Sequence, residues 1–115
     1  MNYNIIVADD VLVNRILLRE QLKTYKNIKL IEVNNGQECI DAVDDSIDLI
    51  LMDVMMPIID GIEATKIIKT NFPKIIIIGV TGQYENEKHL VFDKMLYKPY
   101  RSTELYEVIN TYLKL

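Results

Sequence analysis

The chain has 115 residues, half of them hydrophobic and 26% charged, with a formal net charge of −4 at pH 7. This length fits one domain, and the composition supports a buried core without disulfides or a structural metal. An acidic chain is a poor match for nucleic acid, and no apolar stretch reaches transmembrane length. We therefore expect one domain over residues 1–115 that binds neither nucleic acid nor a membrane.

The single cysteine, Cys39, cannot form an internal disulfide, which fits a reducing compartment. The first ten residues, MNYNIIVADD, lack the basic segment and the long apolar segment of a secretory signal peptide. Both features predict a cytoplasmic location. Cys39 itself falls in a predicted helix, where a packed thiol is a better interpretation than a nucleophile.

The chain begins with a strand, a helix and a second strand. Residues 3–8 are apolar and β-branched, which predicts a buried strand, and residues 28–33 alternate as in a half-buried edge strand. Between them, residues 13–25 predict an amphipathic helix. The apolar side of this helix is expected in the core: Val13, Ile16, Leu17, Leu22 and Tyr25. Its charged side is expected in solvent: Arg15, Arg19, Glu20 and Lys23.

A turn at residues 34–36 then leads to a short helix through Ile40 and Val43. The apolar run at residues 47–52 suits a strand buried on both faces, and Asp53 stands at its end.

The second half of the chain continues this alternation. Residues 62–70 predict an amphipathic helix, and residues 74–80 predict another strand buried on both faces. The polar stretch at residues 83–93 allows only a short helix. A brief strand at residues 94–97 leads to a final helix with Ser102 as its N-cap. The apolar residues of this helix are expected in the core: Leu105, Val108, Ile109 and Tyr112.

Strands that alternate with helices imply βαβ units, right-handed crossovers and a parallel sheet with helices on both faces. Five strands and five helices make a small doubly wound α/β domain, in which the fourth helix, at residues 83–93, is shortened.

Four of the predicted strands end in polar residues. The first is followed by Asp9 and Asp10, the third by Asp53, the fourth by Thr81 and the fifth by Lys98. Because the carboxyl ends of parallel strands lie at one edge of the sheet, these side chains are expected to converge there. Each has an ordinary structural explanation when taken singly, such as a helix cap or a solvated lysine. The ordered set on four strand ends favours a functional site.

Three carboxylates pressed together repel one another, and a hard divalent cation with oxygen ligands, most simply Mg²⁺, resolves that repulsion. Lys98 offers a positive charge for an anion, and Thr81 offers a hydroxyl donor for a phosphoryl oxygen. Carboxylates, Mg²⁺, an ammonium group and a hydroxyl together describe a site for phosphoryl transfer onto an aspartate.

This ordered set resembles the receiver domain of two-component response regulators over essentially the whole chain. The matching residues are Asp9-Asp10, Asp53 with Met55-Met56-Pro57, Asp60-Gly61, Thr81-Gly82 and Lys98-Pro99. The resemblance implies the strand order 2-1-3-4-5 and a phosphoryl group taken from a histidine kinase or a histidine phosphotransfer protein. It also implies a downstream protein effector. A receiver domain is not an enzyme, apart from catalysing its own phosphorylation and dephosphorylation.

By the same resemblance, Asp53 is the phosphoacceptor, and Asp10 and Asp53 bind Mg²⁺ directly. The backbone carbonyl of Met55 completes the protein ligands, and Asp9 assists through water.

The resemblance further implies that Lys98 pairs with the phosphoryl group, that Thr81 moves toward it as the switch, and that the peptide bond before Pro99 is cis. Two features depart from the family. The position three residues before the lysine, usually Tyr or Phe, is Met95, whose flexible thioether can fill the same gap. Thr81 and Lys98 are 17 positions apart, several fewer than usual. We therefore expect the input chemistry to be retained and the output surface to be atypical.

Three alternatives stay open. One is a pseudo-receiver, which binds proteins without regulated phosphorylation. Another is a hydrolase that works through an aspartyl phosphate, although such enzymes usually carry a second carboxylate two residues after the nucleophile, where this chain has Met55. The third is a flavin-binding protein of similar topology, although acidic residues after the first strand would repel the cofactor phosphates.

Overall fold

Five parallel strands form the centre of the protein, and the computed structural model describes residues 2–82 and 90–114. The strands are β1 (Tyr3–Ala8), β2 (Ile28–Val33), β3 (Leu49–Asp53), β4 (Ile76–Thr81) and β5 (Lys94–Tyr97). Their order in the sheet, β2-β1-β3-β4-β5, is the predicted one. Ala8 pairs with Met52 and Asp53 pairs with Val80, so the carboxyl ends of β1, β3 and β4 lie at the same level.

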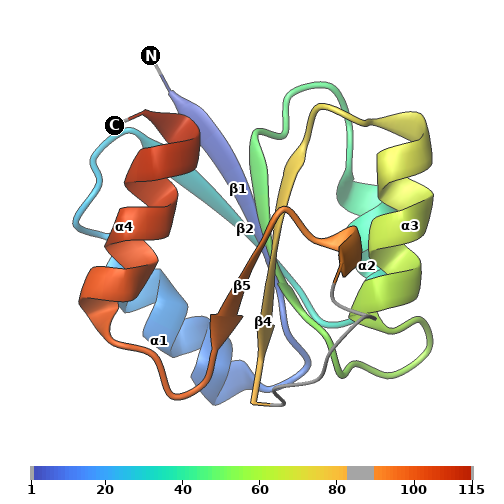
Figure 1. Ribbon diagram of the computed structural model, residues 1–115, viewed down its shortest axis with the longest axis horizontal. Coiled ribbons are helices and arrows are strands. Elements are labelled where there is room, and N and C mark those ends of the chain that lie inside the picture. The colour runs from blue at the N-terminus through green and yellow to red at the C-terminus, as the bar shows by residue number, and fades with distance from the viewer. Residues whose placement is uncertain (1, 83–89, 115) are drawn as a thin grey trace.

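Within the described residues, four helices cover the sheet: α1 (Leu12–Leu22), α2 (Gly36–Ala42), α3 (Gly61–Asn71) and α4 (Ser102–Leu113). Helices α1 and α4 lie on one face and α2 and α3 on the other, which confirms the doubly wound arrangement (Figure 1). The shortened helix predicted at residues 83–93 falls mostly on residues 83–89, which lie outside the described residues. The described residues that follow, Leu90 and Val91, belong to a 3-10 turn.

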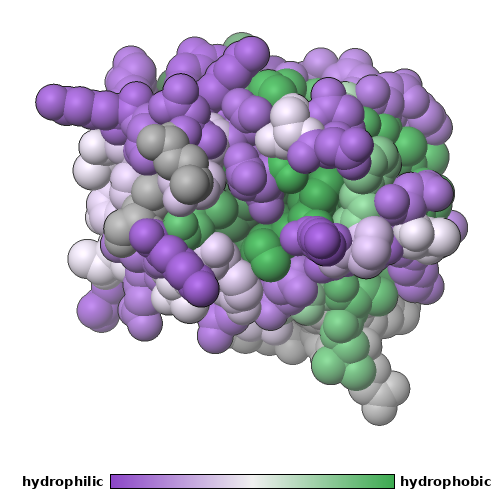
Figure 2. All heavy atoms as spheres, turned by 90° about the horizontal axis from the view of Figure 1, so that it is seen from above, coloured by the Kyte–Doolittle hydropathy of each residue, from purple (hydrophilic) through white to green (hydrophobic). Residues whose placement is uncertain are grey.

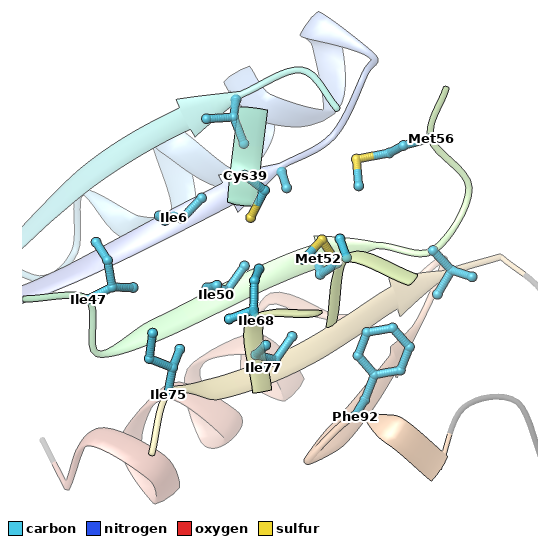
Figure 3. Close-up of a cluster of buried hydrophobic side chains, with 14 residues drawn as sticks. Ile6, Cys39, Ile47, Ile50, Met52, Met56, Ile68, Ile75, Ile77 and Phe92 are labelled. Atoms are coloured by element: carbon cyan, nitrogen blue, oxygen red, sulfur yellow. The ribbon is translucent and has the colours of Figure 1, made fainter. Parts of the chain in front are cut away.

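A cluster of buried hydrophobic side chains packs between the sheet and helices α2 and α3 (Figure 3). Ile6, Ile50 and Ile77 from the sheet meet Ile68 from α3 and Cys39 from α2, and each is at most 2% exposed. Burial raises the pKa of the Cys39 thiol to about 12, so the thiol stays protonated. The predicted role of Cys39 as a packed core residue is confirmed.

Helix α1 turns a different side to the core from the one that its sequence pattern predicts. Leu18 and Leu22 are buried against the sheet, and the side chain of Arg15 is only 12% exposed because it reaches Glu32 on β2. The prediction was therefore wrong for Arg15, which was expected in solvent, and for three apolar residues, which are 71%, 39% and 54% exposed: Val13, Ile16 and Leu17. A buried cation needs a partner, and Glu32 supplies one.

Side chains fix the start of two helices near the carboxyl end of the sheet. Asp60 Oδ1 accepts a hydrogen bond from the backbone N–H of Glu63 at 2.9 Å and caps α3. Helix α4 begins one position earlier than predicted, because Ser102 is its first helical residue and Arg101 is the N-cap. The Arg101 N–H donates to Glu104 Oε1 at 3.2 Å.

The surface at the amino ends of the strands differs from the surface at their carboxyl ends. Both termini lie at the end where the strands begin, and the surface there is largely hydrophilic, with hydrophobic side chains on one part of it (Figures 1 and 2). The polar residues that follow the strands lie at the other end. Among residues 2–82 and 90–114, no helix has the length and apolar character that crossing a membrane requires.

Candidate functional site

Three carboxylates meet at the carboxyl edge of the sheet. Asp9 and Asp10 follow β1, and Asp53 ends β3, which pairs with β1. Each of the three offers an oxygen within 4.8 Å of the others. Asp9 and Asp53 are buried, at 3% and 8% exposed, and Asp10 is exposed. Such a group of hard oxygen ligands suits Mg²⁺.

Asp9 is held through every polar group that it has. Its carboxylate accepts a hydrogen bond from the Val11 N–H at 2.9 Å on Oδ1 and lies 3.5 Å from the Lys98 Nζ on Oδ2. Its backbone N–H donates to the carbonyl of Val33 at 3.2 Å, and its carbonyl accepts from Nη1 of Arg15 at 2.8 Å. These contacts therefore fix the position of Asp9 in the site.

The carboxyl group of Asp53 has a pKa raised from 3.8 to about 6. The main cause is burial; the nearby Lys98 ammonium lowers this pKa, and the charges of Asp9 and Asp10 raise it. The Met55 N–H donates to Asp53 Oδ1 at 3.3 Å and also favours the charged form. Burial and the two neighbouring acids thus disfavour the charged form of Asp53, which a divalent cation would stabilise.

The ends of β4 and β5 bring Thr81 and Lys98 to the same edge. Thr81 is buried at the end of β4 and pairs in register with Tyr97. The Lys98 N–H donates to the Thr81 carbonyl at 2.7 Å, and the Lys98-Pro99 peptide bond is cis, as the resemblance implies. The structure thus brings together the side chains of the three acids and Lys98, with Thr81 on the adjacent strand end.

The loop after Asp53 returns tightly to the strand. The Gly61 N–H donates to the Val54 carbonyl at 2.9 Å, and a Cβ atom at position 61 would overlap the Asp53 carbonyl oxygen. Only glycine fits there, because the start of α3 lies directly against the strand end. Met55 lies in this loop with its side chain exposed.

Met95 lies half-buried on β5, opposite Gly79 on β4. A Cβ atom at position 79 would lie 2.5 Å from the Met95 sulfur and 2.9 Å from the ring of Phe92. The thioether therefore occupies the space above Gly79.

Two features near the site were missed by sequence reasoning. One is Arg15, which shares a helix face with Leu18 and Leu22 (i, i+3 and i+7), although its charge favours solvent and a second apolar stripe competes for the core. The other is an exposed group of large hydrophobic side chains at the start of α1, which we name the α1 apolar face: Val11, Leu12, Val13, Ile16 and Leu17. A cavity of about 210 Å³ between α1 and residues 98–100 is lined by Leu17 of this face together with Asp9 and Lys98.

The strand order and the acidic edge define a doubly wound domain of the flavodoxin-like class. Within this class, residues 5–110 match the model of the response regulator receiver domain, and the chain belongs to that family.

Among curated proteins, the chain is 43% identical over 89 residues to hybrid signal transduction histidine kinase H of Dictyostelium discoideum, a match that covers 72% of this chain and 6% of that protein. It is 31% identical over 118 residues to the transcriptional regulatory protein CpxR of Escherichia coli K12, covering 99% of this chain and 50% of CpxR. The chain thus spans half the length of one relative and a small part of the other.

Two solved structures share the fold. The receiver domain of Ssk1 from Saccharomyces cerevisiae, crystallised with the histidine phosphotransfer protein Ypd1, has a TM-score of 0.88 and 25% identity over 96% of this chain and 88% of that chain. The receiver domain of the sensor histidine kinase PA1611 from Pseudomonas aeruginosa PAO1 has a TM-score of 0.88 and 22% identity over the whole of both chains. That second structure holds a magnesium ion in its active-site cleft.

Proposed function

We propose that this chain accepts a phosphoryl group on Asp53 in a Mg²⁺-dependent reaction and thereby switches a surface that binds a downstream protein. The donor is a histidine kinase or a histidine phosphotransfer protein. The observation that carries the proposal is the meeting of Asp9, Asp10 and Asp53 within 4.8 Å, with Lys98 3.5 Å from Asp9. The single domain over residues 1–115 and the cytoplasmic location stay predictions.

The residues of the site fit Mg²⁺. Asp10 and Asp53 would bind the ion directly, the Met55 carbonyl would complete the protein ligands, and Asp9 would act through water. The raised pKa of Asp53 supports this assignment, because it means that the charged form of Asp53 is disfavoured and that a bound cation would stabilise it. When bound, the ion supplies charge that stabilises the phosphoryl oxygens during transfer.

The transfer itself uses the chain's own carboxylate as nucleophile. An oxygen of Asp53 forms a bond to phosphorus while the bond from phosphorus to the donor imidazole nitrogen breaks. The nitrogen keeps the electron pair and takes a proton from solvent. The charge of Lys98, which pairs with Asp9 and also acts on Asp53, would pair with the new phosphoryl oxygens. Thr81 is the hydroxyl donor on the neighbouring strand.

The α1 apolar face is the surface that we assign to the phosphodonor protein. Five large hydrophobic side chains exposed on the N-cap and first turns of one helix are unusual unless something covers them. The Val11 N–H donates to Asp9, so this face borders the acidic cluster. A second copy of the chain would bring two acidic clusters together, which like-charge repulsion opposes. A donor protein instead brings one phosphorylated imidazole to Asp53, and the negative charge of its phosphoryl group would be met by Lys98 and by Mg²⁺.

The test is the intact mass after incubation with acetyl phosphate and Mg²⁺. The wild type should gain one phosphoryl group, and Asp53→Asn should gain none. A wild type that gains nothing, while its fold remains native by circular dichroism, would favour the pseudo-receiver alternative. A gain of mass in Asp53→Asn would place the acceptor elsewhere.

A further inference from the structure

We propose that Arg15 is a positioning residue for the metal site, because it fixes the peptide between Asp9 and Asp10 and so aims the Asp10 carboxylate at the ion. This inference rests on the proposed function, since it concerns the same site. Arg15 touches no reacting atom; it acts through the backbone.

The contact with the backbone is direct. Nη1 of Arg15 donates to the Asp9 carbonyl oxygen at 2.8 Å. That carbonyl belongs to the peptide unit that ends at Asp10, and a peptide unit is planar. Holding its oxygen therefore fixes the orientation of the backbone that enters Asp10.

Asp10 depends on this constraint more than its neighbour does. The carboxylate of Asp9 is fixed by the Val11 N–H and by Lys98. In residues 2–82 and 90–114 the Asp10 carboxylate receives no such hydrogen bond, and its side chain is exposed. The backbone at Asp10 therefore sets the direction of its Cα–Cβ bond, from which the carboxylate reaches toward Asp53.

The guanidinium of Arg15 is itself held by β2. Its Nε lies 3.4 Å from Oε1 of Glu32, and its side chain is only 12% exposed. Arg19 donates to both oxygens of the same carboxylate, at 2.7 and 3.0 Å. The hydrogen bond from Arg19 lowers the pKa of Glu32, which keeps this carboxylate charged. Glu32 pairs in register with Val7, so the support comes from the rigid sheet.

This arrangement needs an arginine. The planar guanidinium presents several N–H donors in a fixed fork, so one side chain can bind a carbonyl and a carboxylate at once. A lysine at position 15 would keep the charge without this fork. Outer partners of metal ligands commonly change metal affinity by about 10- to 100-fold when they are removed.

The experiment compares Mg²⁺ binding, measured by isothermal titration calorimetry, in the wild type, Arg15→Met and Arg19→Met. Both variants remove a cation that binds Glu32, but only Arg15 contacts Asp9. We expect Arg15→Met to bind Mg²⁺ about 10-fold or more weakly. Arg19→Met should show a smaller loss, because Arg15 keeps its contacts with Glu32 and with the Asp9 carbonyl. Thermal unfolding without Mg²⁺ measures the loss of stability in each.

An unchanged Mg²⁺ affinity in Arg15→Met would overturn the inference, and so would an equal loss in both variants. Should Arg15→Met fail to fold, Arg15→Lys takes its place: weaker binding than the wild type supports the inference, and wild-type binding overturns it. A wild type that binds no Mg²⁺ would overturn both the metal site of the proposed function and this inference. The other outcomes do not contradict that metal site.

Discussion

The ammonium group of Lys98 lies 3.5 Å from Oδ2 of Asp9, and both groups come from loops at the carboxyl edge of the sheet. The lysine is therefore already paired before any phosphoryl group arrives. Its charge also acts on Asp53, whose pKa it lowers. Lys98 thus offsets part of the negative charge of the acidic cluster in the unmodified protein, and the same charge is available for the phosphoryl oxygens afterwards.

We expect Lys98→Met to raise the pKa of Asp53 above its value of about 6, because the variant removes the group that lowers this pKa. It should also slow phosphorylation by acetyl phosphate. A carbon-13 NMR titration of the aspartate carboxyl groups measures the pKa directly. Lys94→Met is the matched control, since Lys94 is exposed at the start of β5, at the opposite end of this strand from Lys98, and should leave both quantities unchanged.

The raised pKa of Asp53 makes the stability of the folded protein depend on pH. The unfolded chain releases this proton near pH 3.8 and the folded chain near pH 6, so the folded state binds more protons between these values. The free energy of unfolding therefore falls as the pH rises through this window, by on the order of 3 kcal/mol in the absence of Mg²⁺.

Asp53→Asn removes the buried carboxylate whose ionisation lowers the free energy of unfolding. At neutral pH we therefore expect the variant to be more stable than the wild type, by up to about 3 kcal/mol. Urea unfolding at pH 4 and pH 7 measures the difference, which should shrink at the lower pH. Asp45→Asn, at an exposed aspartate, serves as the control and should show no such pattern. A less stable Asp53→Asn at pH 7 would contradict the argument.

Much of the fold followed from sequence because the strands are short, apolar and separated by helical patterns. The edge strand at residues 28–33 and the strand at residues 94–97 have the bounds that were predicted. The acidic cluster was also predictable, since a parallel sheet brings the ends of β1 and β3 to one edge.

The orientation of α1 was not predictable by the same reasoning. Its sequence contains two overlapping apolar stripes, one through Val13 and Leu17 and one through Leu18 and Leu22. In the fold, the second stripe is buried together with Arg15, which pairs with Glu32, a residue that only the folded chain brings near it. Helical periodicity within α1 carries no information on a contact that α1 makes with β2.

The close approach of α3 to Asp53 gives a further prediction. In Gly61→Ala the new methyl group would overlap the Asp53 carbonyl oxygen, which is backbone and cannot move aside without shifting the strand end. We expect a loss of stability of about 1–3 kcal/mol and slower phosphorylation by acetyl phosphate. Gly82→Ala is the control for stability, because a Cβ atom at position 82 has no neighbour within 4 Å.

The α1 apolar face gives a prediction about the donor. The double variant Val13→Ser with Leu17→Ser removes two exposed hydrophobic side chains, so it should leave the stability of the isolated domain nearly unchanged. Burial of two such side chains by a partner is worth a few kcal/mol, so phosphotransfer from a histidine phosphotransfer protein should slow by about 10-fold or more at limiting concentration. Phosphorylated Ypd1 is a suitable first donor, since it was crystallised with a similar receiver domain.

Acetyl phosphate separates docking from chemistry, because a small donor needs no protein surface. The double variant should therefore accept a phosphoryl group from acetyl phosphate at the wild-type rate. Leu90→Ser removes an exposed hydrophobic side chain away from α1 and should behave as the wild type with either donor. An equal loss with both donors would mean that the substitutions disturb the acidic cluster. Unchanged transfer from every protein donor that phosphorylates the wild type would show that the phosphodonor docks on another face.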